Sequence, residues 1–194
     1  MYKKIIFFYI LLNIFNINIY AKSFNIIATV NNIAITHIDL ENEIKILSIL
    51  NKKDLSDQQI NIAFNNLIEE IIKKKEINNE SLKIDESLIN NHFLQISKNL
   101  NLNTINIDQN LILLIKEKIK IDKLWNDLVM KKYGWKISIN MNEIDQKLEG
   151  KNKENYSKQI KDKLVLDEKN KKLSVYSRYH LSKLKEESMI KFYK

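Results

Sequence analysis

The first regular pattern in the chain is a pair of short apolar runs separated by a sharp corner. Apolar residues alternate along residues 26–30, Asn31 and Asn32 follow, and residues 33–35 are apolar again. Two such runs joined by two turn-forming residues predict a β-hairpin. An isolated hairpin is barely stable in water, so helices from later in the chain are expected to cover it.

Four helices are predicted after the hairpin, because apolar residues there recur every three or four positions. Thr36 with Asp39, and Ser56 with Gln59, form capping-box pairs that mark the starts of the first two helices. Gly134 is expected to end the fourth helix. The predicted helices cover residues 37–50, 56–75, 84–100 and 111–134.

The last part of the chain predicts a separate helix that returns to the body. Residues 136–139 are expected to be extended, and residues 141–148 to form one or two helical turns. A narrow apolar seam then predicts a charged helix that reaches about Ile190. A lone helix of this kind is marginal in water, so it should pack on the body. The expected divisions are a leader at 1–21, a core at 22–149, a linker at 150–155 and a closing helix at 156–194.

Composition favours a helical protein with neither disulfides nor thiol chemistry. The 194 residues include two glycines, no proline and no cysteine, so turn formers are scarce and a cysteine-bound metal is excluded. The predicted fold class is therefore mainly α, with a short amino-terminal hairpin and a long carboxy-terminal helix that packs back on the core.

The positive net charge does not indicate a nucleic-acid partner. The charge is +8, and removal of a leader that contains Lys3 and Lys4 would lower it to +6. The remaining lysines are dispersed among glutamates, and Arg178 is the only arginine. Nucleic-acid binding usually needs a gathered basic surface, so we expect no nucleic-acid partner.

The first 21 residues have the pattern of an export signal. Lys3 and Lys4 precede an apolar run from Ile5 to about Tyr20, and Ala21 offers a small residue for cleavage. An uncleaved anchor is the alternative, but asparagines interrupt the run and it is short for a membrane span. We therefore expect cleavage after Ala21, no stable membrane span afterwards, and a periplasmic location.

No side chains in the sequence form a recognisable catalytic or ligand-binding motif. His37, His92 and His180 are not spaced as metal ligands on one turn. The adjacent pairs Glu69-Glu70 and Glu186-Glu187 are interpreted as solvated helix surfaces. We therefore assign no catalytic, cofactor-binding or metal-binding residue, expect no cofactor, and leave the substrate-binding residues unassigned.

The two tryptophans, Trp125 and Trp135, are interpreted as core and rim packing instead of a binding motif.

The order of these parts resembles the amino-terminal module of the SurA-like periplasmic chaperones. After an export signal, that family has an apolar strand, a turn into a capped helix, and a helix with a Leu-Ile face. The segment SRYHLSKLKEESMIKFY also resembles the family's closing helix. Matching positions are Val30, Asn31, Ile35, Thr36, Asp39, Leu40, Leu67, Ile68, Ile71 and Ile72.

The chain departs from this family where members usually carry parvulin-type peptidyl-prolyl isomerase domains. Only about ten residues, from Leu148 to Tyr156, occupy that place. An isomerase domain of about a hundred residues does not fit there, so we expect no enzymatic activity.

The resemblance implies an ATP-independent holdase that binds unfolded outer-membrane proteins or apolar peptides and assists their assembly. Its binding surface is expected between the hairpin, the third helix and the returning helix. A reduced parvulin-type isomerase and a non-catalytic subunit with one fixed partner remain alternatives. Client identity, oligomeric state and an isomerase on a separate chain stay open.

Overall fold

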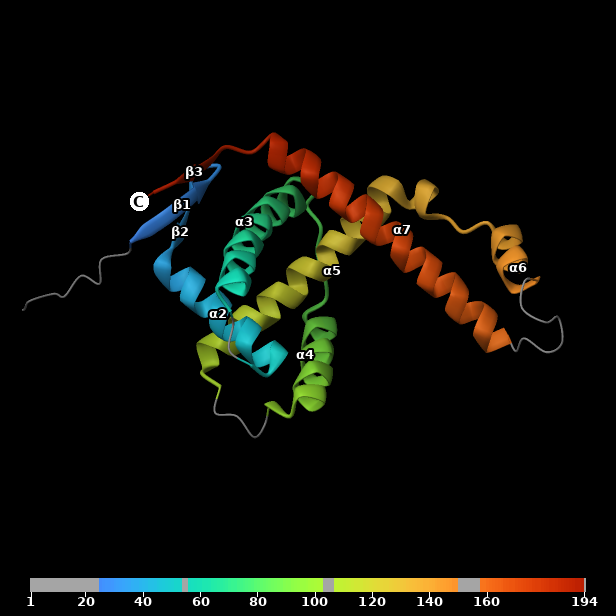
Figure 1. Ribbon diagram of the computed structural model, residues 1–194, viewed down its shortest axis with the longest axis horizontal. Helices are drawn as coiled ribbons and strands as arrows, with labels where there is room; N and C mark the ends of the chain where they lie inside the picture. The colour runs from blue at the N-terminus through green and yellow to red at the C-terminus, as the bar shows by residue number, and fades with distance from the viewer. Residues whose placement is uncertain (1–24, 54–55, 103–106, 150–157, 194) are drawn as a thin grey trace, which may run out of the picture.

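A small antiparallel sheet and six helices make up the described part of the computed structural model, which covers residues 25–53, 56–102, 107–149 and 158–193 (Figure 1). The predicted leader at 1–21 and the predicted linker at 150–155 lie outside these residues. The strands are β1 (Ile26–Val30), β2 (Ile33–Thr36) and β3 (Ile190–Phe192). The helices are α2 (His37–Asn51), α3 (Asp57–Asn79), α4 (Glu86–Leu100), α5 (Gln109–Ile137), α6 (Met141–Glu149) and α7 (Lys158–Glu186).

The predicted hairpin is confirmed. β1 and β2 are antiparallel, and the turn between them holds Asn31 at φ 51° and Asn32 at φ 69°. Asparagine tolerates this left-handed backbone better than most residues, which explains why two asparagines make the corner.

The expectation that the last helix reaches Ile190 is wrong. α7 ends at Glu186, and β3 adds to the sheet beside β1, in the order β2-β1-β3. The hairpin turn holds the incoming chain, because Met189 N donates to Asn31 Oδ1 and Asn31 N donates to Met189 O. Ile190 and Phe192 alternate with Lys191, which is a strand pattern. Three residues are too few to be recognised as a strand when a long helical pattern precedes them.

Both predicted capping boxes are present. Thr36 N donates to Asp39 Oδ2 at 2.7 Å, and Asp39 N donates to Thr36 Oγ1 at 3.2 Å. Ser56 N likewise donates to Gln59 Oε1 at 3.0 Å. Each pair satisfies backbone groups at a helix start that would otherwise lack partners.

Gly134 does not end α5, as the sequence had indicated. The helix continues to Ile137, so residues 136–137 are helical and not extended. Ile137 is buried among core residues of α3, α5 and α7, and this burial stabilises the extra turn of helix. A Cβ at Gly134 would meet no atom within 4 Å, so packing does not require a glycine there.

The core has two parts. The larger one surrounds Trp125, Leu128 and Val129 of α5 and includes side chains from the sheet, α3 and α7. The smaller one joins α2, α4 and α5 through Ile46, Ile89, Ile115 and Ile119. α5 contributes to both parts and is therefore the central helix of the fold.

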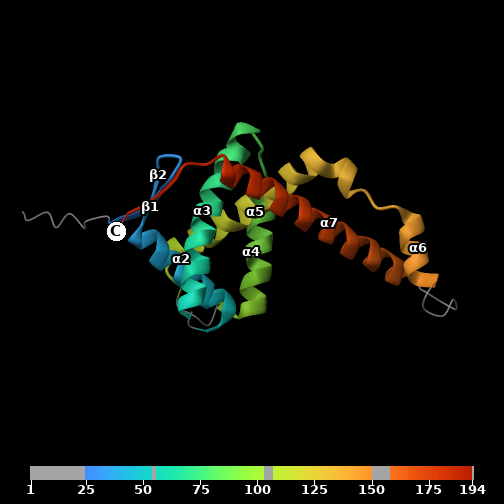
Figure 2. The ribbon, with the colours of Figure 1, turned by 45° about the horizontal axis from the view of Figure 1, so that its top comes forward.

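α7 returns to the core as predicted and packs along α5 and α3 (Figures 1 and 2). Its first half extends beyond the body and runs beside α6, where Ile144 is buried and Lys161 pairs with Asp145 at 2.6 Å. Among the described helices, none combines the length and the apolar character that a membrane span needs.

Candidate functional site

A cleft of about 470 Å³ lies between α2, α3, α4 and α5. A smaller one of about 210 Å³ lies beside β2, between that strand and α2, α3 and α5. The expected binding surface between hairpin, third helix and returning helix is not one of these hollows. Figure 1 shows the reason, since α4 packs on α5 and lies well away from the sheet.

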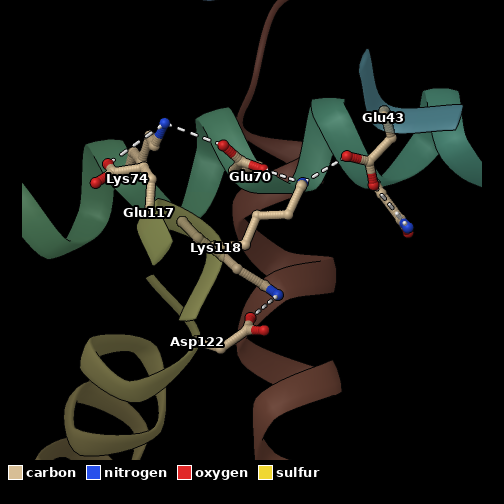
Figure 3. Close-up of polar contacts among 8 residues, drawn as sticks. Glu43, Glu70, Lys74, Glu117, Lys118 and Asp122 are labelled. Atoms are coloured by element: carbon tan, nitrogen blue, oxygen red, sulfur yellow. Dashed lines mark hydrogen bonds and ion pairs between the residues drawn. The ribbon is translucent and has the colours of Figure 1, made fainter. Parts of the chain in front are cut away.

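Four residues line both clefts, and three of them, Glu43, Glu70 and Lys118, are charged. Lys118 of α5 places its Nζ 2.6 Å from Glu43 Oε2 and 2.5 Å from Glu70 Oε2 (Figure 3). Lys74 joins the group, 3.0 Å from Glu70 and 3.6 Å from Glu117. Glu43 is buried, and its side chain also accepts a hydrogen bond from Asn66 Nδ2 at 3.4 Å. The group therefore ties α2, α3 and α5 together.

The charges of this group stabilise one another. Burial opposes ionisation of Glu70, but Lys118 and Lys74 outweigh it and lower the pKa of Glu70. Burial also disfavours the Lys118 ammonium, but Glu70 and Glu43 outweigh it and raise the pKa of Lys118. Both partners are thus held in their charged forms at neutral pH.

The expectation that Glu69 and Glu70 form a solvated face is wrong for Glu70. Only 19% of its side chain is exposed, and it lies against Lys118. Glu69 pairs across to α7, 3.1 Å from Lys185 Nζ. Because each carboxylate has a lysine partner, we interpret this pair as structural and not as an acid and base for catalysis.

The structure does not bring the three histidines together. His37 lies 3.5 Å from Glu41 on the surface, and His92 lines the larger cleft. His180 is buried, 3.1 Å from the Tyr133 hydroxyl. Within the ranges that the structure describes, no three His, Asp or Glu side chains are grouped as metal ligands would be.

An aromatic cluster lies where the end of α5 crosses α7. We define it as Tyr133, Trp135, Tyr176 and Tyr179. The Tyr133 ring stacks on Tyr176 at 5.4 Å and meets the edge of Tyr179 at 6.2 Å. Lys136 connects Trp135 to the rest, since its Nζ lies 4.8 Å from the Trp135 ring and 5.8 Å from the Tyr176 ring.

Two members of the aromatic cluster face solvent. Trp135 is 75% exposed and Tyr179 is 59% exposed. Trp125 is in the core, as predicted, but Trp135 is too exposed for the expected packing role. Large exposed aromatic rings are typical of binding surfaces, where they supply contact area at low entropic cost.

A buried pair of rings, Trp125 and His180, packs against Tyr133 of the aromatic cluster. Trp125 stacks on His180 at 5.4 Å, and its Nε1 donates to Ser177 Oγ at 2.8 Å. Burial and Lys132 lower the pKa of His180, although Glu76 acts in the opposite direction. His180 is therefore neutral at pH 7 and contacts Tyr133 without bringing a charge into the core.

The sequence had given little sign of this cluster. Tyr176 and Tyr179 are three residues apart on one helix, which indicates a shared face. Their pairing with Tyr133, 43 or more positions earlier, depends on how α7 crosses α5. That crossing is set by the core and is not visible in either helix alone.

No protein-family model matches the chain, and no curated protein gives a significant match.

Proposed function

We propose that this protein is a periplasmic, ATP-independent holdase that binds unfolded outer-membrane proteins and keeps them from aggregating. The observation that carries the proposal is the aromatic cluster, in which Trp135 and Tyr179 are exposed and Tyr133 packs on the buried Trp125-His180 pair. Unfolded barrel proteins expose aromatic and aliphatic side chains at alternate positions of their strands, which such rings can contact without demanding one sequence.

The helices around the cluster add further uncovered apolar side chains. Val175 is exposed next to Tyr176 in α7, and Met141, Ile160 and Leu166 are exposed farther along α6 and α7. Scattered exposed apolar residues are normal on a protein surface, so they carry weight here only beside a connected aromatic cluster. Together, the cluster and these apolar side chains offer a client many weak contacts, from which it can dissociate without ATP hydrolysis.

The location and the absence of catalysis are parts of the same proposal. The apolar leader with Lys3, Lys4 and Ala21 supports export to the periplasm. The carboxylates of Glu43 and Glu70 are both paired with Lys118, so in this proposal they stabilise the fold and do not transfer protons. The resemblance to SurA-like chaperones supports the class of client.

Light scattering after dilution of an outer-membrane barrel protein from urea tests this function. At a several-fold molar excess, the exported protein should reduce the scattering by at least half, without ATP. An equal amount of a folded basic protein such as lysozyme is the control for a nonspecific charge effect. Scattering equal to that of the control would contradict the proposed holdase function.

Two further assays separate the alternatives. Proteins that copurify after crosslinking should be many outer-membrane proteins, whereas one stoichiometric band would favour a subunit with a fixed partner. Isomerisation of a proline peptide should stay at the uncatalysed rate, and acceleration would favour a reduced parvulin-type isomerase.

A further inference from the structure

The outer edge of β3 is open in the described part of the chain. β3 pairs with β1 in a register that sets Lys191 opposite Thr29, and Tyr193 N donates to Ile27 O at 3.0 Å. Alternate residues of a strand direct their N–H and C=O groups to opposite sides. The backbone groups of Ile190 and Phe192 therefore face away from β1, and no described strand lies beyond them.

The other edge of the sheet offers less. Ala34 lies opposite Thr29, whose backbone groups face β3, so Ala34 directs its own groups outward. The next outward group is Thr36 N–H, which already donates to Asp39. β2 therefore has one residue whose backbone N–H and C=O groups are both open to an added strand, and β3 has two.

The side chains of β3 favour a partner strand in which apolar and negatively charged residues alternate. Ile190 and Phe192 share the sheet face that packs on α3, and the Phe192 ring lies 5.9 Å from the Phe64 ring while 66% of the residue stays exposed. Lys191 lies on the opposite face. Among the described residues, no carboxylate pairs with it. An added strand would meet an apolar face on one side and a free positive charge on the other.

A second copy of the chain fits this edge poorly. Antiparallel pairing of two β3 strands through Ile190 and Phe192 would place the two Lys191 side chains directly opposite each other. Like charges in that position destabilise a strand pair, and a lysine on an edge strand is a common protection against self-association.

We propose that β3 is a docking edge for an extended client segment, which adds to the sheet as an antiparallel strand. This inference rests on the proposed chaperone function. The preferred segment alternates apolar with acidic residues, so that its apolar side chains lie beside Ile190 and Phe192 and its acidic side chain lies beside Lys191. Backbone hydrogen bonds supply affinity for many sequences, and the alternation supplies preference.

Backbone methylation of a peptide tests this docking mode. The probe is a labelled nine-residue peptide that alternates phenylalanine with glutamate, and its binding is followed by fluorescence anisotropy. Methyl groups on two phenylalanine amides should weaken binding about tenfold, since those N–H groups face β3. Methyl groups on two glutamate amides should change binding less than twofold. Equal effects of the two modifications would overturn the edge assignment.

A charge reversal tests the preference. Lys191→Glu should weaken binding of the glutamate peptide about two- to fivefold and strengthen binding of a matched phenylalanine-lysine peptide. Lys169→Glu, an exposed change on α7, is the control and should leave both peptides unaffected. Equal responses of the two variants, or a dimer by sedimentation with no peptide binding, would contradict the proposal.

These outcomes stay separate from those of the holdase assay. If methylation has no position dependence but scattering is still suppressed, the edge assignment fails and the chaperone function stands. If methylation acts as expected but scattering is not suppressed, the edge binds peptides and the chaperone function fails.

Discussion

Lys118→Met should lower the free energy of unfolding by about 3–5 kcal/mol at pH 7, because it leaves the buried Glu43 carboxylate without its ion-pair partner and leaves Glu70 with Lys74 alone. Glu43 and Glu70 lie within 2.6 Å of the Lys118 ammonium, and Glu43 is buried. Urea unfolding followed by circular dichroism measures the loss. Most domains have only about 5–15 kcal/mol of stability, so this variant should be close to unfolding at 37 °C.

The control is another lysine of the same helix. Lys120 pairs with Glu86 at 3.1 Å on the surface, and Lys120→Met should cost less than about 1 kcal/mol. Adding Glu43→Gln and Glu70→Gln to Lys118→Met should recover at least half of the loss, since neutral amides cost less to bury. A Lys118→Met loss no larger than that of Lys120→Met would contradict this account of the group.

The pH dependence of the Lys118→Met loss has a definite direction. In the native protein the pKa of Glu70 is lowered, so its contribution to stability is present above the unfolded value of about 4.5 and is lost as the pH falls through the folded value. The variant keeps only the part of this contribution that Lys74 supplies. The difference in stability between the two proteins should therefore be large at pH 7 and shrink as the pH falls below about 4.5.

Trp125→Ala should cost about 3–5 kcal/mol, as large-to-small changes of buried aromatic residues do. The Trp125 side chain is 2% exposed, stacks on His180 and donates to Ser177. Its removal would leave a cavity between α5 and α7, and α7 should open before the rest of the body. Hydrogen exchange across α7 measures this opening, alongside urea unfolding.

Trp125→Phe is the matched control, because it keeps an aromatic ring but removes the indole donor. Its cost should be about 1–2 kcal/mol. If Trp125→Ala leaves the unfolding midpoint unchanged, or if amides of α4 lose protection before those of α7, Trp125 does not hold α7 to α5.

Local signals predicted most of the helices and the hairpin correctly. Thr36 with Asp39 determines a helix start within a few residues, and Asn31 with Asn32 determines a two-residue turn. These features depend on neighbours in the chain, so one sequence is enough to find them.

Features that depend on tertiary contacts were missed. β3 forms because the edge of β1 lies next to the end of α7, and nothing within residues 186–193 shows that this edge is near. Glu70 was expected to be solvated because its partner, Lys118, lies 48 positions later. α5 continues beyond Gly134 because Ile137 is buried in the core.

The candidate site was less predictable than the fold. Trp125 and Trp135 are the same residue type on one helix, ten positions apart, and the packing of α3 and α7 on α5 decides which one is covered. For the same reason, the sequence alone assigned no client-binding residue.

The holdase account rests most directly on the aromatic cluster, and one comparison of variants tests it. Trp135→Ser with Tyr179→Ser removes the two exposed rings, whereas Leu94→Ser with Leu113→Ser removes two similarly exposed apolar side chains on α4 and the first half of α5. In light scattering of a barrel protein diluted from urea, the first variant should lose at least half of the suppression, and the second should suppress like the native protein. Equal suppression by both variants would contradict the claim that this cluster binds clients.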